Sequence, residues 1–254
     1  MTQSQNKNTT HRNPEIIRFL TELRSRLINA CIVLLLLAAV LLYFANDLYH
    51  FLALPLLRYI PQGHLIATQI VSPFFVPFKL ALLTATLISM PYFLYQIWAF
   101  ITPALYGVER RLVGPFLLAS IVLFYAGIVF SYTVIFPMLF HFLAQVAPVG
   151  VQLSPDIGEY LDFTIKLLLV FGVLFEIPMM MCLLVLLRVT TREKLKKMRP
   201  YALVGAFIIG MLFSPPDVIS QTILAIPIWL LYELGLFFTR FVKQEEQVQD
   251  SEVL

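Results

Sequence analysis

Charged residues are scarce in this 254-residue chain, at 13% of the total against about 25% in an ordinary globular domain. Hydrophobic residues make up 59%, and the net charge of +3 gives no indication of nucleic-acid binding. Both cysteines, Cys31 and Cys182, lie in apolar runs without CxxC or Cys/His spacing, so we predict neither a disulfide framework nor a metal site. The four histidines form no HExxH motif, and no GxSxG nucleophile motif occurs. The sequence therefore predicts an integral membrane protein with no catalytic residues, metal or cofactor.

Long apolar runs dominate what is present. A membrane-spanning helix needs about 20 mostly apolar residues, and the chain offers six candidates, at residues 27–45, 74–101, 112–138, 160–188, 200–214 and 217–239. Prolines interrupt most of these spans and predict bent helices around a concave surface: Pro77, Pro91, Pro115, Pro137, Pro178 and Pro227. We expect an all-α membrane domain over residues 15–240, a disordered cytoplasmic tail over 1–14 and a cytoplasmic C-terminal tail over 241–254.

The basic residues predict the orientation of these spans, because Lys and Arg concentrate in cytoplasmic loops. All 18 of them except Arg58, Lys79 and Lys166 fall in the N-terminal tail, the second loop, the fourth loop or the C-terminal tail. An even number of spans places both termini on the same side. Both termini are therefore expected to be cytoplasmic.

The fifth span is too short for an ordinary bilayer. From residue 200 to residue 214 a helix rises roughly 21 Å, against a hydrocarbon core of about 30 Å. The sixth span is tied to the fifth by the short SPPD connection, so we expect both to be short and the bilayer to be thinned beside them. Misplaced boundaries in a tilted pair of helices are the alternative.

Two glutamates at the predicted cytoplasmic interface admit two interpretations each. Residues 15–27 have the spacing of an amphipathic helix, on which Glu22 lies one turn from both Arg18 and Arg26 and could simply pair with them. Glu109 could stabilise the N-terminus of the third span through the helix dipole. Alternatively, two carboxylates on one side of the membrane could receive two guanidinium groups of a ligand.

Glu176 lies near the middle of an apolar span, where an acidic group costs about 2.5–3.5 kcal/mol or more to insert. It is therefore a functional candidate, and Pro178 predicts a kink beside it. A protonated glutamate that bonds a neighbouring helix for packing is the alternative. Asp162 and Lys166, one turn apart, are expected to form a local ion pair. A midplane site of Glu176 with Lys79 or Lys166 would instead indicate a proton-coupled secondary transporter of a small solute, although no internal repeat supports one.

Several long motifs across residues 18–240 resemble the TatC family, the multispanning core of the twin-arginine protein translocase. They are FLTELRSRL (19–27), YFANDLYHFLALPLL (43–57), SPFFVPFKL (72–80), LYQIWAFITPALYGVERR (94–111), FGVLFEIP (171–178), KKMRPYALVGAFIIGMLFSPPDVISQTILAIP (196–227) and YELGLFF (232–238). The resemblance implies a cupped protein of six helices that recognises twin-arginine signal peptides. With the single-span partners TatA and TatB it would move folded proteins across the membrane, using the proton gradient and several copies of the chain.

The resemblance also implies roles for particular residues. The signal-peptide site would comprise Glu22, Arg24, Phe100, Pro103, Leu105, Tyr106, Glu109 and Arg111. Contacts with partner helices would involve Glu176, Asp217 and Gln221, and the chain would bend at Pro55 and Pro91. A bacterial inner membrane is expected, because no transit peptide precedes residue 15.

Arg18 departs from the family pattern, in which many members carry histidine at this position. A permanent cation one turn before Glu22 could compete with the signal peptide for that carboxylate. We therefore expect Arg18→His to leave transport intact or to improve it, as measured by export of a twin-arginine cargo and by signal-peptide crosslinking. A severe loss of crosslinking would refute the competition.

Overall fold

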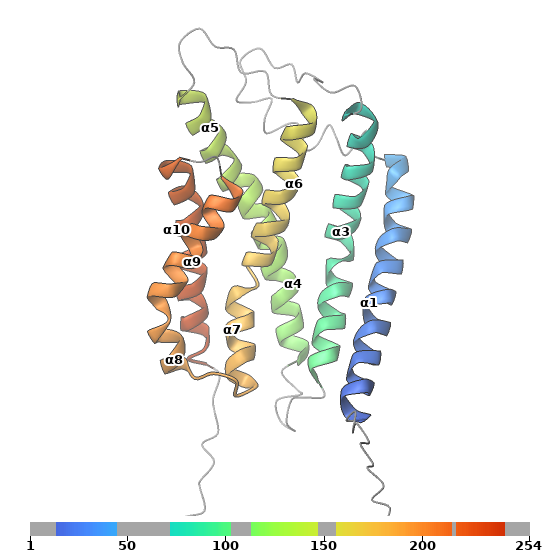
Figure 1. The fold of residues 1–254 in the computed structure, drawn as a ribbon, viewed down its shortest axis with the longest axis vertical. Coiled ribbons are helices and arrows are strands. Elements are labelled where there is room, and N and C mark those ends of the chain that lie inside the picture. The colour runs from blue at the N-terminus through green and yellow to red at the C-terminus, as the bar shows by residue number, and fades with distance from the viewer. Residues whose placement is uncertain (1–13, 45–71, 103–112, 147–155, 215–216, 242–254) are drawn as a thin grey trace, which may run out of the picture.

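The computed structural model describes residues 14–44, 72–102, 113–146, 156–214 and 217–241, and helices dominate this described part (Figure 1). Both predicted tails fall outside it except at residues 14 and 241. Pro55 of the first loop also lies outside the described residues, as do Pro103, Leu105, Tyr106, Glu109 and Arg111 of the second.

The first two spans are nearly continuous helices. The first comprises α1 (Pro14–Leu41) and a short 3-10 turn, η1 (Leu42–Phe44). The second is α3 (Ser72–Ile101), which continues through both Pro77 and Pro91. Helix α3 has no charged residue in its first or last turn. It is both long enough and apolar enough to cross a membrane.

The third and fourth spans are interrupted beside two of the prolines that predicted bends, Pro137 and Pro178. The third consists of α4 (Val113–Phe130), a π-helical turn η4 (Ser131–Ile135) and α5 (Phe136–Val146), with Pro137 as the second residue of α5. The fourth breaks between α6 (Ile157–Leu174) and α7 (Ile177–Leu186), just before Pro178. A proline has no N–H for the helical ladder and disturbs the preceding turn, and π turns bend helices.

The last elements are α8 (Arg192–Lys197), α9 (Arg199–Phe213) and α10 (Val218–Phe238). Helix α9 has 15 residues, about 22 Å, which confirms that the fifth span is short. Helix α10 has 21 residues, about 31 Å, so it is the shortest of the long spans yet is long enough to cross. Five long apolar helices and the shorter α9 within the described residues confirm the six predicted spans.

The helices pack as an open row rather than around one central helix. Helix α1 packs mainly on α3 at one edge, whereas α10 packs on α9 and α7 at the other (Figure 1). The main core lies between them and joins α3, η4, α5 and α6 through fully buried Leu80, Phe136 and Phe171. Side chains of α1 such as Leu35 and Leu36 are 64% exposed, as expected for a surface that faces lipid.

Glycines allow the closest approaches between helices. A Cβ atom at Gly127 of α4 would lie 2.5 Å from the backbone oxygen of Phe171 in α6. A Cβ atom at Gly210 of α9 would lie 2.8 Å from the backbone oxygen of Gln221 in α10. Since backbone atoms cannot turn aside as a flexible side chain can, both helix crossings depend on the absence of a side chain.

We expect Gly127→Ala to lower the free energy of unfolding by about 1–3 kcal/mol, because α4 and α6 must separate to admit the methyl group. The measurement is thermal unfolding of the purified protein in detergent. Gly205→Ala in α9 is the matched control, because nothing lies within 4 Å of its added Cβ and alanine is the better helix former. Equal loss of stability in the two variants would contradict the close-crossing account.

Candidate functional site

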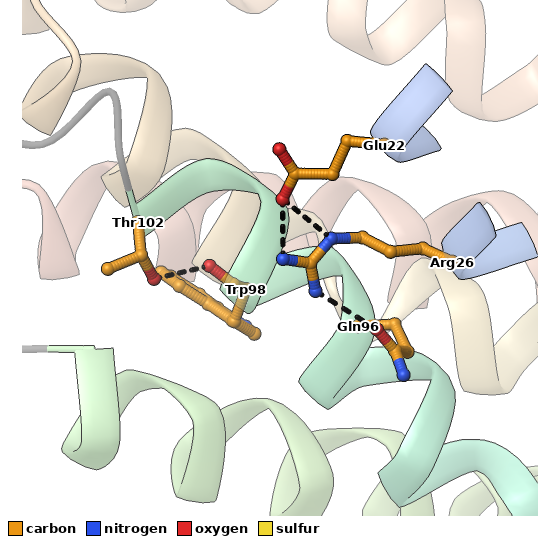
Figure 2. A network of polar contacts seen from close by, with 5 residues as sticks. All are labelled: Glu22, Arg26, Gln96, Trp98 and Thr102. Carbon is orange, nitrogen blue, oxygen red and sulfur yellow. Dashed lines mark hydrogen bonds and ion pairs between the residues drawn. The ribbon is translucent and has the colours of Figure 1, made fainter. Parts of the chain in front are cut away.

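A polar cluster joins the beginning of α1 to the last turns of α3 (Figure 2). Glu22 and Arg26 lie one turn apart on α1, and Glu22 Oε1 accepts hydrogen bonds from Arg26 Nη2 at 2.7 Å and Nε at 3.1 Å. The remaining arm of the guanidinium group, Nη1, donates to Oε1 of Gln96 in α3 at 3.0 Å. One arginine therefore holds a carboxylate of its own helix and an amide of the neighbouring helix.

The cluster lies where the second loop begins. Thr102 Oγ1 donates to the carbonyl oxygen of Trp98 at 2.7 Å and closes the last turn of α3 (Figure 2). Ile101 before the loop and Val113 after it both pack against an apolar cluster that contains Trp98, and the Trp98 ring stacks on Phe116 with centroids 5.7 Å apart. The ends of α3 and α4 are thus held together by apolar contacts.

The structure places only part of the predicted signal-peptide set. Glu22 and Arg24 lie on the same helix, with Arg24 exposed and Glu22 half-buried, while Phe100 is half-buried in the last turns of α3. The predicted local pairing of Glu22 is confirmed for Arg26, whereas the side chain of Arg18 lies outside the described residues. The second-loop members of the set are not described, so their part in the site stays a prediction.

Sequence reasoning missed Gln96. The sequence does mark it, because Gln96 is a lone amide within the apolar stretch LYQIWAF. Burying an amide in such a place costs free energy unless the amide has a hydrogen-bond partner. The partner, Arg26, is 70 residues away in the chain, so its identity depends on how α1 docks on α3. A pattern confined to one helix could not show it.

Glu176 forms a second polar site, inside the bundle. It lies at the break between α6 and α7, with Pro178 in the first turn of α7, which confirms the predicted kink. Its carboxyl group has the Ser120 hydroxyl of α4 as a hydrogen-bond partner, while Oε1 is buried and meets no partner among the described residues. The same hydroxyl accepts a 3.2 Å hydrogen bond from Trp98 Nε1 in α3. Three spans thus converge on Ser120.

Asp217 and Gln221 connect the last two spans. Asp217 caps α10, because its Oδ2 accepts from the backbone N–H of Ser220 at 2.6 Å. The Gln221 side-chain amide donates to the carbonyl oxygen of Phe207 in α9 at 2.9 Å. Both residues therefore stabilise the α9–α10 hairpin, and the structure brings neither together with Glu22.

The expected pairing of Asp162 with Lys166 is wrong. Asp162 Oδ1 instead lies 2.6 Å from Lys79 Nζ of α3. A local ion pair between Asp162 and Lys166 would stabilise an exposed helix by only about 0.3–0.5 kcal/mol. Lys79 has no acidic residue on its own apolar helix, so its acidic partner must come from another helix. The pair lies 14 residues before Glu176 along the fourth span, about 20 Å away, so Lys79 and Glu176 form no common site.

Close relatives exist among characterised proteins. The Sec-independent protein translocase protein TatC of Escherichia coli strain K12 is 52% identical over 227 residues, which cover 89% of this chain and 88% of the relative. The protein of the same name from Haemophilus influenzae is 50% identical over 232 residues, 91% of each chain. A crystal structure described as the twin arginine translocase receptor TatC superposes with a TM-score of 0.80 at 37% identity, covering 89% of this chain and all of that one.

The helices and the two polar sites define a multispanning α-helical membrane protein, with one polar cluster at an end of the bundle and one buried carboxyl group inside it. The family model for the Sec-independent protein translocase protein TatC matches residues 18–227. The chain belongs to the TatC family and is a core component of the twin-arginine (Tat) translocase. The expected all-α membrane fold and the expected place in the Tat translocase are thereby confirmed.

We expect Ser120→Ala to lower the free energy of unfolding by about 1–3 kcal/mol, because the Trp98 N–H and the Glu176 carboxyl group both lose their partner in a buried place. Thermal unfolding in detergent measures the effect.

Ser131→Ala provides a matched control in the same span. The Ser131 hydroxyl is buried but has no hydrogen-bond partner among the described residues, so its removal should be neutral or stabilising. If both alanines behaved alike, Ser120 would not be the hub of a hydrogen-bonded network.

Proposed function

We propose that this chain recognises twin-arginine signal peptides with the polar cluster of α1 and α3 and the adjoining second loop. The observation that carries the proposal is the Glu22–Arg26 contact, in which one carboxylate oxygen receives two N–H groups of one guanidinium. The Glu22 side chain remains 41% exposed, so its carboxylate is accessible to a ligand. A site that already binds one arginine side chain has the charge and geometry to bind another.

The roles in this site follow from side-chain chemistry. Glu22 and Glu109 would each receive one guanidinium group of the signal peptide, and Arg24 and Arg111 would limit the net negative charge between them. The remaining members would partly exclude water: Phe100, Pro103, Leu105 and Tyr106. Exclusion of water matters because an exposed ion pair contributes only about 0–1 kcal/mol. Arginine would be preferred over lysine because its planar fork makes two parallel hydrogen bonds to a carboxylate.

The setting of this site is a bacterial inner membrane with both termini in the cytoplasm, which places signal-peptide recognition on the cytoplasmic side. Supporting this, α1 begins and α10 ends at the same end of the bundle, where the basic helix α8 also lies (Figure 1). Basic segments favour the cytoplasmic side. A peptide emerging from the cytoplasm would then meet Glu22 before it enters the bilayer.

Partner helices of TatA and TatB would bind elsewhere on the chain, at Glu176, Asp217 and Gln221. The unsatisfied Oε1 of Glu176 supports this, since a buried polar atom favours any partner that can supply a hydrogen bond. Several copies of the chain would assemble in the receptor complex, and the proton gradient would drive transport. The competing function, a small-solute transporter with Glu176 and either Lys79 or Lys166 in one site, is not favoured. Lys79 pairs with Asp162, and Lys166 lies ten residues before Glu176, about 15 Å along the span.

Binding of one signal peptide in Arg-Arg and Lys-Lys forms tests the recognition site. We expect the purified protein in nanodiscs to prefer the Arg-Arg form, and expect Glu22→Gln or Glu109→Gln to weaken that form by about five- to tenfold, the loss of one partly desolvated charge-assisted contact. Glu109→Asp should weaken it less than Glu109→Ala. Fluorescence anisotropy of a labelled peptide measures each affinity.

Glu193→Gln is the matched control, because Glu193 is exposed in the first turn of α8 and its change removes the same charge near the same end of the bundle. It should leave the Arg-Arg preference intact. A preference that survives both Glu22→Gln and Glu109→Gln would remove these carboxylates from the site.

A further inference from the structure

A pocket of about 370 Å³ lies between the first half of α6 and the end of α9. Its lining differs from the rest of the lipid-facing surface because it carries charges of both signs. Helix α6 contributes Glu159, Asp162 and Lys166, and α9 ends in the wall at Leu212 and Phe213, followed by Ser214. The recognition cluster of α1 lies toward the other end of the bundle (Figure 1).

The charges of this pocket are arranged along one face of α6. Spacings of three and four residues place Glu159, Asp162 and Lys166 above one another on a helix. Asp162 is held by Lys79 of α3 at 2.6 Å, whereas Glu159 and Lys166 are exposed and form no ion pair with any described residue. Within the described part of the chain, the pocket therefore presents a carboxylate and an ammonium group without ion-pair partners, about ten Å apart along the helix.

The charged residues of α6 lie beside the end of the short helix α9. Lys166 lies nine residues after Ile157, about 14 Å along α6, and Leu212, Phe213 and Ser214 line the same pocket. Charged groups are costly in hydrocarbon, and a short helix draws the polar surface of the bilayer toward its end. Lipid headgroups drawn toward Ser214 in this way would face the charges of α6.

We propose that this pocket binds the phosphoethanolamine headgroup of a zwitterionic phospholipid. The headgroup phosphate would pair with Lys166, and the primary ammonium would donate hydrogen bonds to Glu159 and Asp162. The acyl chains would follow α9, where Met211 is 58% and Leu212 67% exposed. The proposal concerns the other end of the molecule and does not depend on signal-peptide recognition.

The charge pattern selects among headgroups. A purely anionic headgroup would bring its phosphate to Lys166 but leave Glu159 unpaired and repelled. A phosphocholine headgroup carries both charges, but its quaternary ammonium has no N–H to donate to the carboxylates. Charge-assisted hydrogen bonds are the stronger ones, so of these three headgroups phosphoethanolamine is the one that satisfies both ends of the pocket.

Native mass spectrometry of the delipidated full chain tests the site. The probes are phosphatidylethanolamine, phosphatidylcholine and phosphatidylglycerol with identical acyl chains. We expect phosphatidylethanolamine to bind about fivefold more tightly than the other two, the ratio typical of one or two partly exposed charge contacts. Lys166→Gln and Glu159→Gln should each abolish this preference. Lys166→Arg keeps the charge and should therefore retain the preference for phosphatidylethanolamine. It is the variant to measure if Lys166→Gln fails to fold.

Lys197→Gln and Glu193→Gln in α8 are matched controls, because they remove the same charges from the other end of the bundle. They should leave the preference unchanged. Equal binding of the three lipids, or an unchanged preference in both pocket variants, would overturn the proposal. Soluble glycerophosphoethanolamine and inorganic phosphate complete the test: competition by phosphate alone would identify a simple anion site and refute the lipid assignment.

Discussion

The structure depends on one constraint: a polar group inside the membrane must find its partner within the protein. Ser120 meets this constraint at the centre of the bundle, where its hydroxyl joins Trp98 of α3 to Glu176 at the break of the fourth span. The Trp98 ring also lies in the apolar cluster against which Ile101 and Val113 pack, so this network and the ends of α3 and α4 share one side chain.

The short fifth span places a constraint on the lipid as well, because the bilayer beside it has to be thinner. Helix α9 ends about 22 Å from its start, and the α9–α10 turn is held by the Asp217 cap and by the hydrogen bond from Gln221 to Phe207. The close crossing at Gly210 fixes α9 against α10, so α9 cannot slide along α10 to reach the far surface of the bilayer. The membrane must adapt instead, and the charged face of α6 lies where it does so.

The six spans, the short fifth span and the kink at Glu176 were predictable because each depends on residues near one another in the chain. Apolar runs determine span length, and Pro178 disturbs the turn in which it lies. The contact of Lys79 with Asp162 and that of Arg26 with Gln96 were not predictable, since each depends on the docking of two helices distant in sequence. The expected Asp162–Lys166 pair failed for this reason: helix spacing identified a possible contact but could not weigh it against Lys79 across the interface.

Arg26 constrains how the proposed site could bind a signal peptide. The guanidinium group occupies Glu22 Oε1 with two N–H groups and donates a third to Gln96, so its position is set by both α1 and α3. An incoming arginine must then approach the other carboxylate oxygen or displace Arg26 from Oε1. Either way Glu22 contributes only a partly screened contact, because its side chain is 41% exposed. In the proposed site, strong discrimination between arginine and lysine would therefore require a second carboxylate, and Glu109 is our candidate from the sequence.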